Sequence, residues 1–271
     1  MAFCETGMNL LVWAGLVLGV TLLAPVRASA LPPLAAHHAV YSLSLKPGAN
    51  SGAIAASGAM RFDFADSCDG WVTAQHMVVD LTDNTGHEQH MVTDYATIEN
   101  HEGTKLTFHS RQGRNGTITS LVDGVAVLSH PGGGGYADFT TPDHKRVLLP
   151  AGTKLPTAHT AALLRAAEAG QKFMAAPLFD GTDDGGAQDS FVVSGRHYPA
   201  GPGKFAMLDG MSSTGVRIAF YDQGKGDQSP EFETAMRYYA NGVASELEMN
   251  FGDFTLLGHL DQLAPKAAPH C

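Results

Sequence analysis

The sequence has few cysteines and few basic residues. Three cysteines occur in 271 residues, and no two of them form the Cys-x-x-Cys pair of dithiol oxidoreductases. The chain has 17 Lys and Arg against 27 Asp and Glu, which gives a formal net charge of −10. An acidic chain without a basic stripe lacks the electrostatic footprint for nucleic acid or for an anionic membrane surface. We therefore expect no nucleic-acid partner.

Long hydrophobic runs are also scarce, and the one present lies at the N-terminus. Residues 10–23 are apolar, small or hydroxyl-bearing, and Ala28-Ser29-Ala30 follows. This run is shorter than the roughly 18 to 20 residues of a membrane span and ends in an Ala-x-Ala site, as a cleaved secretory signal does. We predict a signal peptide over residues 1–30 and a periplasmic mature chain over residues 31–271 with no stable membrane span. Because no Lys or Arg precedes the run, an uncleaved anchor is the alternative.

Signal removal would take Cys4 away and leave Cys68 and Cys271. A cysteine at the chain end is poorly placed for packing, because chain ends fray unless something holds them. We therefore predict a disulfide between Cys68 and Cys271, which requires an oxidising compartment. The alternative is a reactive thiol at Cys68, but the neighbouring carboxylate of Asp69 opposes thiolate formation.

Alternation of apolar and polar residues dominates the rest of the chain and predicts an antiparallel all-β protein of about 14 strands. A sheet of this many strands must curl or close on itself. Asn115-Gly116, Asp123-Gly124 and Asn241-Gly242 indicate hairpin turns. The expected strands are residues 40–45, 58–64, 71–81, 90–98, 105–110, 118–122, 125–128, 136–140, 173–179, 191–193, 205–208, 216–221, 232–240, 243–251 and 254–260.

One helix interrupts the strands. Residues 158–169 are rich in Ala and Leu, Thr157 precedes them as a candidate N-cap, and Gly170 stands where a helix ends. We predict one main helix near residues 157–169. Because a helix and not a linker separates the two groups of strands, we expect residues 31–271 to form a single domain.

The sequence shows no convincing catalytic or metal-binding pattern. There is no Gly-x-Ser-x-Gly nucleophile elbow and no phosphate-binding loop. His87 and His90 are three residues apart, which places them on opposite faces of a strand. The loop over residues 180–186 holds three carboxylates but lacks the distal Glu of an EF-hand. We expect no catalytic residue, no metal and no cofactor.

Several short segments, in order, resemble the EipB family of periplasmic cell-envelope integrity proteins. The resemblance runs from about residue 39 to residue 271. It is carried by Cys68-Asp69-Gly70-Trp71, Leu149-Pro150-Ala151-Gly152-Thr153, Pro156-Thr157-Ala158-His159-Thr160, Leu178-Phe179-Asp180-Gly181, Pro230-Glu231-Phe232-Glu233, Gly242-Val243 and the C-terminal Cys271.

The resemblance implies a β-spiral, which is a single large curved antiparallel sheet that stays open like a half-barrel, with helices in its concave region. It also implies one disulfide, Cys68 to Cys271, and a role in envelope maintenance. It transfers no catalytic residue. The family-motif positions, which we interpret as structural, are Asp69, Gly70, Trp71, Pro156, Thr157, His159, Asp180, Gly181, Pro230 and Glu231.

Three functions follow from these observations. The first is a non-enzymatic periplasmic protein that supports cell-envelope integrity through a protein partner. The alternative is a carrier of lipid or lipoprotein in the concave face, where the apolar positions of residues 60–64 and 247–251 would line a groove. The second alternative is a secreted hydrolase that uses a carboxylate pair such as Asp180 and Asp253.

Overall fold

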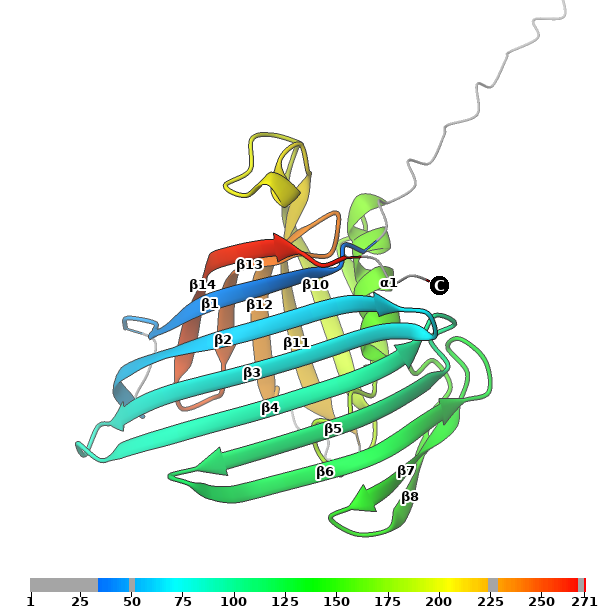
Figure 1. Cartoon of the computed structure of the whole chain (residues 1–271), viewed down its shortest axis with the longest axis horizontal. Helices are drawn as coiled ribbons and strands as arrows, with labels where there is room; N and C mark the ends of the chain where they lie inside the picture. The colour runs from blue at the N-terminus through cyan, green and yellow to red at the C-terminus, as the bar shows by residue number, and fades with distance from the viewer. Residues whose placement is uncertain (1–33, 49–51, 224–228, 268–270) are drawn as a thin grey trace, which may run out of the picture. The chain divides into compact units, whose positions relative to one another are not determined.

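The structure, a computed structural model, describes residues 34–48, 52–223, 229–267 and 271. The predicted signal peptide, residues 1–30, lies outside these ranges. Within them the chain forms one 14-stranded antiparallel sheet that curves strongly but does not close into a barrel (Figure 1). The elements are β1 (His37–Leu45), β2 (Ala53–Ser67), β3 (Gly70–Asp83), β4 (Glu88–Asn100), β5 (Lys105–Arg114), β6 (Thr117–Leu128), β7 (Gly135–Thr141), β8 (Lys145–Leu149), α1 (Pro156–Glu168), β9 (Phe173–Leu178), β10 (Gln188–Tyr198), the 3-10 turn η1 (Ala206–Leu208), β11 (Ser213–Asp222), β12 (Phe232–Tyr239), β13 (Ala244–Asn250) and β14 (Thr255–Pro265).

The sheet consists of two meanders that meet in its middle. The strand order is β8-β7-β6-β5-β4-β3-β2-β1-β14-β13-β12-β11-β10-β9. Strands β1–β8 and β9–β14 are therefore each joined neighbour to neighbour, and the pairing of β1 with β14 links the two groups. The first and last strands lie at the centre of the sheet, whereas β8 and β9 form its edges.

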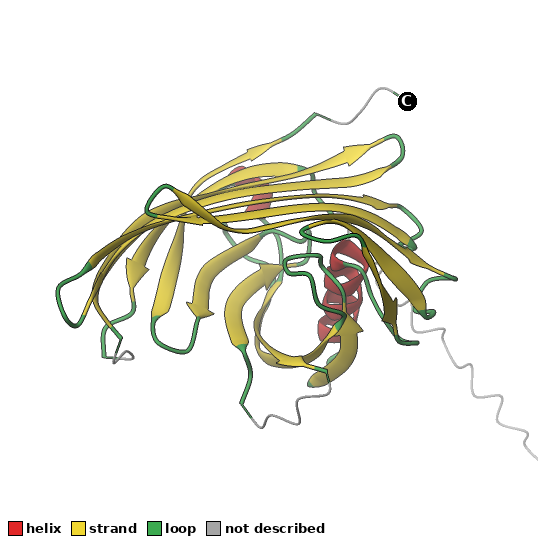
Figure 2. Cartoon of the chain, turned by 90° about the horizontal axis from the view of Figure 1, so that it is seen from below, coloured by secondary structure: helices red, strands yellow, loops and turns green. Residues whose placement is uncertain are grey.

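The two edges approach each other through the segment between β8 and α1. The Lys154 N–H donates to the Pro177 carbonyl at 2.8 Å, and the Lys154 carbonyl accepts from the Phe179 N–H at 3.1 Å. The helix then lies inside the curve of the sheet (Figure 2). Leu163 and Leu164 of α1 pack with Val192, Val216 and Ile218 of strands β10 and β11. The concave side is thus partly filled by a helix, which the family resemblance implies.

Two other apolar clusters hold the sheet, one around its centre and one toward its β8 edge. One joins residues of β1–β3 to β12–β14, including Tyr41, Met60 and Met249. The other joins β5–β8 to the segments that flank α1, with Phe108, Phe139 and Phe179 in mutual edge contact at 5.4 to 6.2 Å. Most predicted apolar positions therefore serve as core.

Three predicted elements differ in the structure. Residues 205–208, predicted as a strand, contain the 3-10 turn η1 instead. Residues 118–122 and 125–128 are one strand, β6, and not two strands around a turn at Asp123-Gly124. Gly124 lies inside β6, and the position requires glycine because a Cβ there would lie 2.4 Å from the Asp138 carbonyl and 2.5 Å from the Phe108 ring. Strand β8, whose sequence KRVLL does not alternate cleanly, was not expected.

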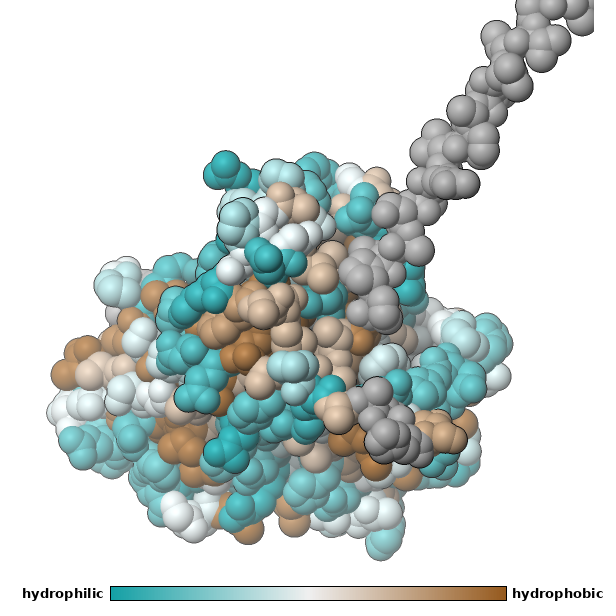
Figure 3. Space-filling view, turned by 45° about the horizontal axis from the view of Figure 1, so that its top comes forward, coloured by the Kyte–Doolittle hydropathy of each residue, from teal (hydrophilic) through white to brown (hydrophobic). Residues whose placement is uncertain are grey.

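The surface carries both hydrophobic and hydrophilic residues (Figure 3). Figure 3 shows one face on which hydrophobic residues gather near the centre and hydrophilic residues surround them. Among the described residues, no helix combines the length and the apolarity that a transmembrane helix needs.

Candidate functional site: an internal cavity

A cavity of about 380 Å³ lies on the concave side of the sheet, against α1. This volume is in the range of small-molecule binding sites. The described lining residues come from strands β1–β5, β9, β11 and β12, from α1, from two turns and from Leu34 ahead of β1. The cavity therefore depends on both meanders and on the helix, and not on any single hairpin.

Strand register explains how one wall of the cavity forms. Phe62 of β2 lies opposite Gln75 of β3, Gln75 lies opposite Tyr95 of β4, and Tyr95 lies opposite Ser110 of β5. Directly opposed residues point to the same face of a sheet. This row of four side chains accordingly runs across the concave face, and all four line the cavity.

A carboxylate from the sheet, that of Glu99, accepts hydrogen bonds at the N-terminus of α1. Glu99 of β4 is only 2 % exposed, and its Oε2 and Oε1 accept the N–H groups of Thr157 and Ala158 at 2.6 and 2.9 Å. Burial raises the pKa of Glu99, against the lowering effect of these hydrogen bonds. The first residues of a helix have free N–H groups and a positive partial charge. Glu99 therefore caps α1. The prediction that the Thr157 side chain caps the helix is wrong, because the N-cap residue is Leu155 and it makes no side-chain hydrogen bond to the helix.

Asp180 faces the cavity from the loop after β9. Its Oδ1 accepts the N–H and the hydroxyl of Thr182 at 3.0 and 2.8 Å, while its carbonyl accepts the Tyr95 hydroxyl at 2.8 Å. Burial raises the pKa values of both Asp180 and Tyr95. These bonds join the loop to β4 and fix the carboxylate at the cavity wall.

Two histidines in the lining are held neutral. The His159 Nε2 contacts the Ser190 hydroxyl at 2.8 Å, and that hydroxyl donates to the Ala176 carbonyl at 2.7 Å. Since the serine proton is committed, His159 donates, and burial lowers its pKa to about 4. His37 Nδ1 bonds the Ala35 carbonyl at 2.7 Å, and burial lowers the pKa of His37. Neither ring carries a positive charge near neutral pH.

Four of the family-motif residues come together at the cavity. Pro156, Thr157 and His159 line it from α1, and Asp180 lines it from the loop. Gly181 lies behind them with φ 73°, and a Cβ there would come within 2.4 Å of the Phe108 ring. This position therefore requires glycine for its backbone conformation and for its close approach.

The other motif residues lie elsewhere. Asp69 lies in the β2–β3 turn and Gly70 begins β3, where a Cβ on Gly70 would come within 2.1 Å of the Glu99 carbonyl. Trp71 stacks on Phe64 with ring centroids 5.0 Å apart. Pro230 and Glu231 precede β12, and neither is among the residues that line the cavity.

The residues considered for catalysis or metal binding do not converge. Asp253 lies in the β13–β14 turn beside the backbone of Gly52, away from the residues that line the cavity with Asp180. In the loop after β9, Asp184 pairs with Lys145 at 2.6 Å and Asp183 accepts the Gly185 N–H. Across the part of the chain that the structure describes, no group of three or more His, Cys, Asp or Glu is arranged to hold a metal ion.

Sequence reasoning missed Glu99, Gln75, Tyr95, Gln112 and His37. The alternation of β3–β5 placed Gln75 and Tyr95 on definite faces of their strands. It could not tell which face is concave, because both faces of these strands carry polar residues. Glu99 gave no local signal, since its partners are about 58 residues away in the chain.

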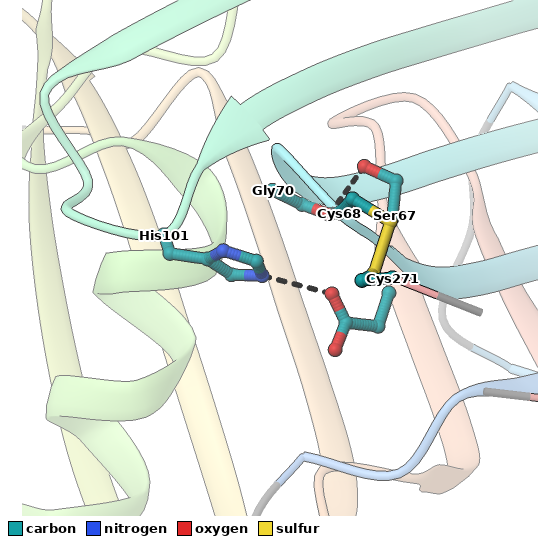
Figure 4. The surroundings of a disulfide bond; sticks show 6 residues. Ser67, Cys68, Gly70, His101 and Cys271 are labelled. Carbon is teal, nitrogen blue, oxygen red and sulfur yellow. Dashed lines mark hydrogen bonds and ion pairs between the residues drawn. A yellow bond between two sulfur atoms is a disulfide. The ribbon is translucent and has the colours of Figure 1, made fainter. Parts of the chain in front are cut away.

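The disulfide lies outside the cavity. Cys68 and Cys271 are joined with their Cα atoms 5.6 Å apart, which is the pairing that the sequence predicts. Figure 4 shows the bridge beside the β2–β3 turn, where the Ser67 hydroxyl donates to the Gly70 carbonyl and His101 pairs with Asp66. Both cysteines are exposed.

Comparison with known proteins gives consistent matches over nearly the whole chain. Residues 28–267 match the family model described as EipB-like. The cell envelope integrity protein EipB of Brucella abortus (strain 2308) is 28% identical over 270 residues, which cover 97% of this chain and 93% of that protein. A crystal structure from Brucella abortus, described as a β-barrel-like protein of a domain of unknown function, DUF1849, superimposes with a TM-score of 0.78 at 26% identity. That match covers 87% of this chain and 99% of the other.

Proposed function

Because this chain belongs to the EipB-like family, we propose that it supports the integrity of the cell envelope from the periplasm, without catalysis, by holding a ligand in the cavity on its concave side. The envelope role rests on the name of the Brucella abortus relative. The binding role rests on one observation, the cavity of about 380 Å³ between the concave face and α1. Its combination of apolar and converging polar side chains is typical of a ligand site.

A cavity-blocking variant tests this proposal. Thr93 lies on the cavity wall of β4, and Thr107 lies on β5 with its side chain exposed. We expect Thr93→Trp to fill the cavity, to abolish binding of an uncharged fluorescent probe, and to fail to restore envelope integrity in a strain that lacks the gene. Thr107→Trp places the same bulk on an exposed position, so it should behave like the unmodified protein.

The readout is survival in detergent together with probe fluorescence. Thermal melts confirm that both variants fold before either result is interpreted. Full rescue by a folded Thr93→Trp protein that no longer binds the probe would contradict the binding role.

A protein partner is a second candidate function, and one surface feature favours it. Phe173 on edge strand β9 and Phe191 on β10 are 64% and 42% exposed, and their rings stack at 5.9 Å. Exposed aromatic pairs on an edge strand are suited to contact another protein. A double variant, Phe173→Thr with Phe191→Thr, should lose a partner that the unmodified protein retains in a crosslinked periplasmic pull-down. Unchanged recovery of every partner would remove this candidate.

A further inference from the structure

The two sides of the cavity differ in chemical character. On β3–β5 the lining side chains are Thr73, Gln75, Thr93, Tyr95, Ser110 and Gln112, all of them polar and uncharged. Thr93 and Gln112 are directly opposite each other, as are Tyr95 and Ser110. The hydroxyls of Thr73 and Thr93 and the carboxamides of Gln75 and Gln112 can both donate and accept hydrogen bonds. The Tyr95 and Ser110 hydroxyls already donate to the carbonyls of Asp180 and Thr182, so their oxygens offer acceptors. This surface, which we call the polar wall, therefore suits ligand groups such as hydroxyls, esters and amides.

The side of the cavity on β9, β11 and β12 is mostly apolar. Leu178, Ile218, Phe220 and Met236 line it, and Thr234 and Tyr238 of β12 add two hydroxyl groups. Phe62 and Phe64 of β2 add apolar side chains to the lining directly beside the polar wall, because Phe62 lies opposite Gln75 and Phe64 lies opposite Thr73. We call this surface the apolar wall. A ligand that contacts both walls must have an apolar part and a polar part.

Charge restricts the polar part further. Among the described lining residues there is no Lys or Arg, and Asp180 is the single carboxylate. His37 and His159 are only 2% and 4% exposed, and because burial disfavours the charged ring and lowers both pKa values, both rings are neutral near pH 7. An anionic group brought into this space would lose its hydration without gaining a cationic partner, and it would face the Asp180 carboxylate.

We propose that the cavity binds an uncharged amphiphile, with its chain on the apolar wall and a neutral hydroxyl- or amide-bearing head on the polar wall. This inference rests on the proposed function and specifies its ligand class. It separates the site from one for anionic phospholipids or free fatty acids. The shared chemistry fits a neutral lipid or the uncharged acylated end of a lipoprotein.

A set of competitors with one chain length and different head charges tests the proposal. The full chain is expressed and purified from the periplasm and loaded with the uncharged probe N-phenyl-1-naphthylamine. 1-Decanoylglycerol, an N-decanoyl dipeptide amide, decanoate and decyltrimethylammonium are then added below their micelle concentrations at pH 7.5. We expect at least one uncharged competitor to displace the probe at a concentration about 10-fold or more below that of decanoate, which corresponds to about 1.4 kcal/mol.

The outcomes separate this inference from the proposed function. Displacement by decanoate at an equal or lower concentration than either uncharged competitor would overturn the neutral class and leave ligand binding in place. Strongest displacement by decyltrimethylammonium would also overturn it, in favour of pairing with Asp180. Failure of the probe and of all four competitors to bind would overturn both. Tighter binding of 1-decanoylglycerol would indicate a neutral lipid as the ligand, and tighter binding of the N-decanoyl dipeptide amide would indicate the acylated end of a lipoprotein.

A pair of matched variants tests the position of the head group. Gln75→Lys places a cation on the polar wall, whereas Gln262→Lys makes the same change on exposed Gln262 of β14. We expect Gln75→Lys to shift the preference about 10-fold toward decanoate and Gln262→Lys to leave it unchanged. If Gln75→Lys does not fold, as judged by its thermal melt, Gln112→Lys replaces it. An unchanged preference in the folded cavity variant would overturn the placement of the head on this wall.

Discussion

Glu99 shows how one side chain ties the sheet to the helix. Its carboxylate is almost fully buried and accepts two N–H groups at the start of α1. Replacing it with alanine would leave both N–H groups buried without this acceptor. We expect Glu99→Ala to lower the free energy of unfolding by about 3 kcal/mol, as measured by urea denaturation. The control is Glu102→Ala, an exposed neighbour three residues away, which should change stability by less than about 0.5 kcal/mol.

His159 should make stability depend on pH. Its pKa is about 4 in the folded protein, against 6.5 for a free histidine, because burial disfavours the charged ring. The unfolded state therefore binds the proton more tightly, so stability is complete above about pH 6.5 and falls as the pH is lowered toward 4. The full loss is about 3 kcal/mol, from 1.36 kcal/mol per unit of pKa.

The test for His159 is a difference between two proteins. Glu99, Asp180 and Asp183 have raised pKa values, which give the opposite slope, and His37 adds a slope of the same sign. These contributions cancel when His159→Gln is compared with the unmodified protein at each pH. We expect the stability difference between the two proteins to change by about 3 kcal/mol between pH 7 and pH 4. A constant difference would show that His159 is not buried in its neutral form.

At the scale of elements, α1 occupies part of the concave side of the sheet and packs against strands β10 and β11. Leu163 is 1% exposed and packs on strands β10 and β11, while Leu148 on edge strand β8 is 78% exposed. We expect Leu163→Ala to cost about 2–5 kcal/mol of stability, as buried leucine truncations do. Leu148→Ala should cost almost nothing by the same chemical denaturation measurement. Equal effects would mean that the helix does not pack against the sheet.

Local sequence rules predicted most elements, and their failures have identifiable causes. Asn115-Gly116 forms the expected turn because both residues take positive φ, 51° and 80°. Asp123-Gly124 carries a similar signal but stays within β6, since its glycine serves the close approach of β7 and Phe108. The sequence does not distinguish these two uses of glycine, because the second depends on strands that are distant in the chain.

The candidate site was harder to predict than the elements. Its lining residues come from eight strands and a helix, so only the tertiary fold brings them together. Pro156, Thr157, His159 and Asp180 stood out in the sequence as family-motif positions, which we interpreted as structural, and the structure places them in the cavity lining. Gln75 and Gln112 did not stand out, since a glutamine in a strand is equally suited to the exposed face.

At the scale of the whole molecule, the disulfide joins the two meanders near their central junction. Beyond β14 the chain continues along the start of β1, where the Lys266 N–H donates to the Ala36 carbonyl and its ammonium group pairs with Asp63 of β2. Cys271 then reaches Cys68 at the end of β2. The bridge therefore spans β1 and reinforces the β1–β14 pairing. It does not connect the edge strands β8 and β9, so it does not close the sheet.

This position predicts what loss of the disulfide does. The bridge closes a loop across a sequence separation of 203, for which the chain-entropy model gives a stabilisation of about 5 kcal/mol. We expect Cys68→Ser with Cys271→Ser to lower the free energy of unfolding by up to that amount.

In the same double variant, hydrogen exchange should rise first in β1 and β14, while β4 and β5, far from the junction, keep their protection. Because the bridge is exposed, mild reductant should produce the same pattern, and alkylation of the mature chain, residues 31–271, without reductant should leave its mass unchanged. Equal loss of protection in all strands would contradict this account, since the bridge would then stabilise the whole sheet and not its central junction.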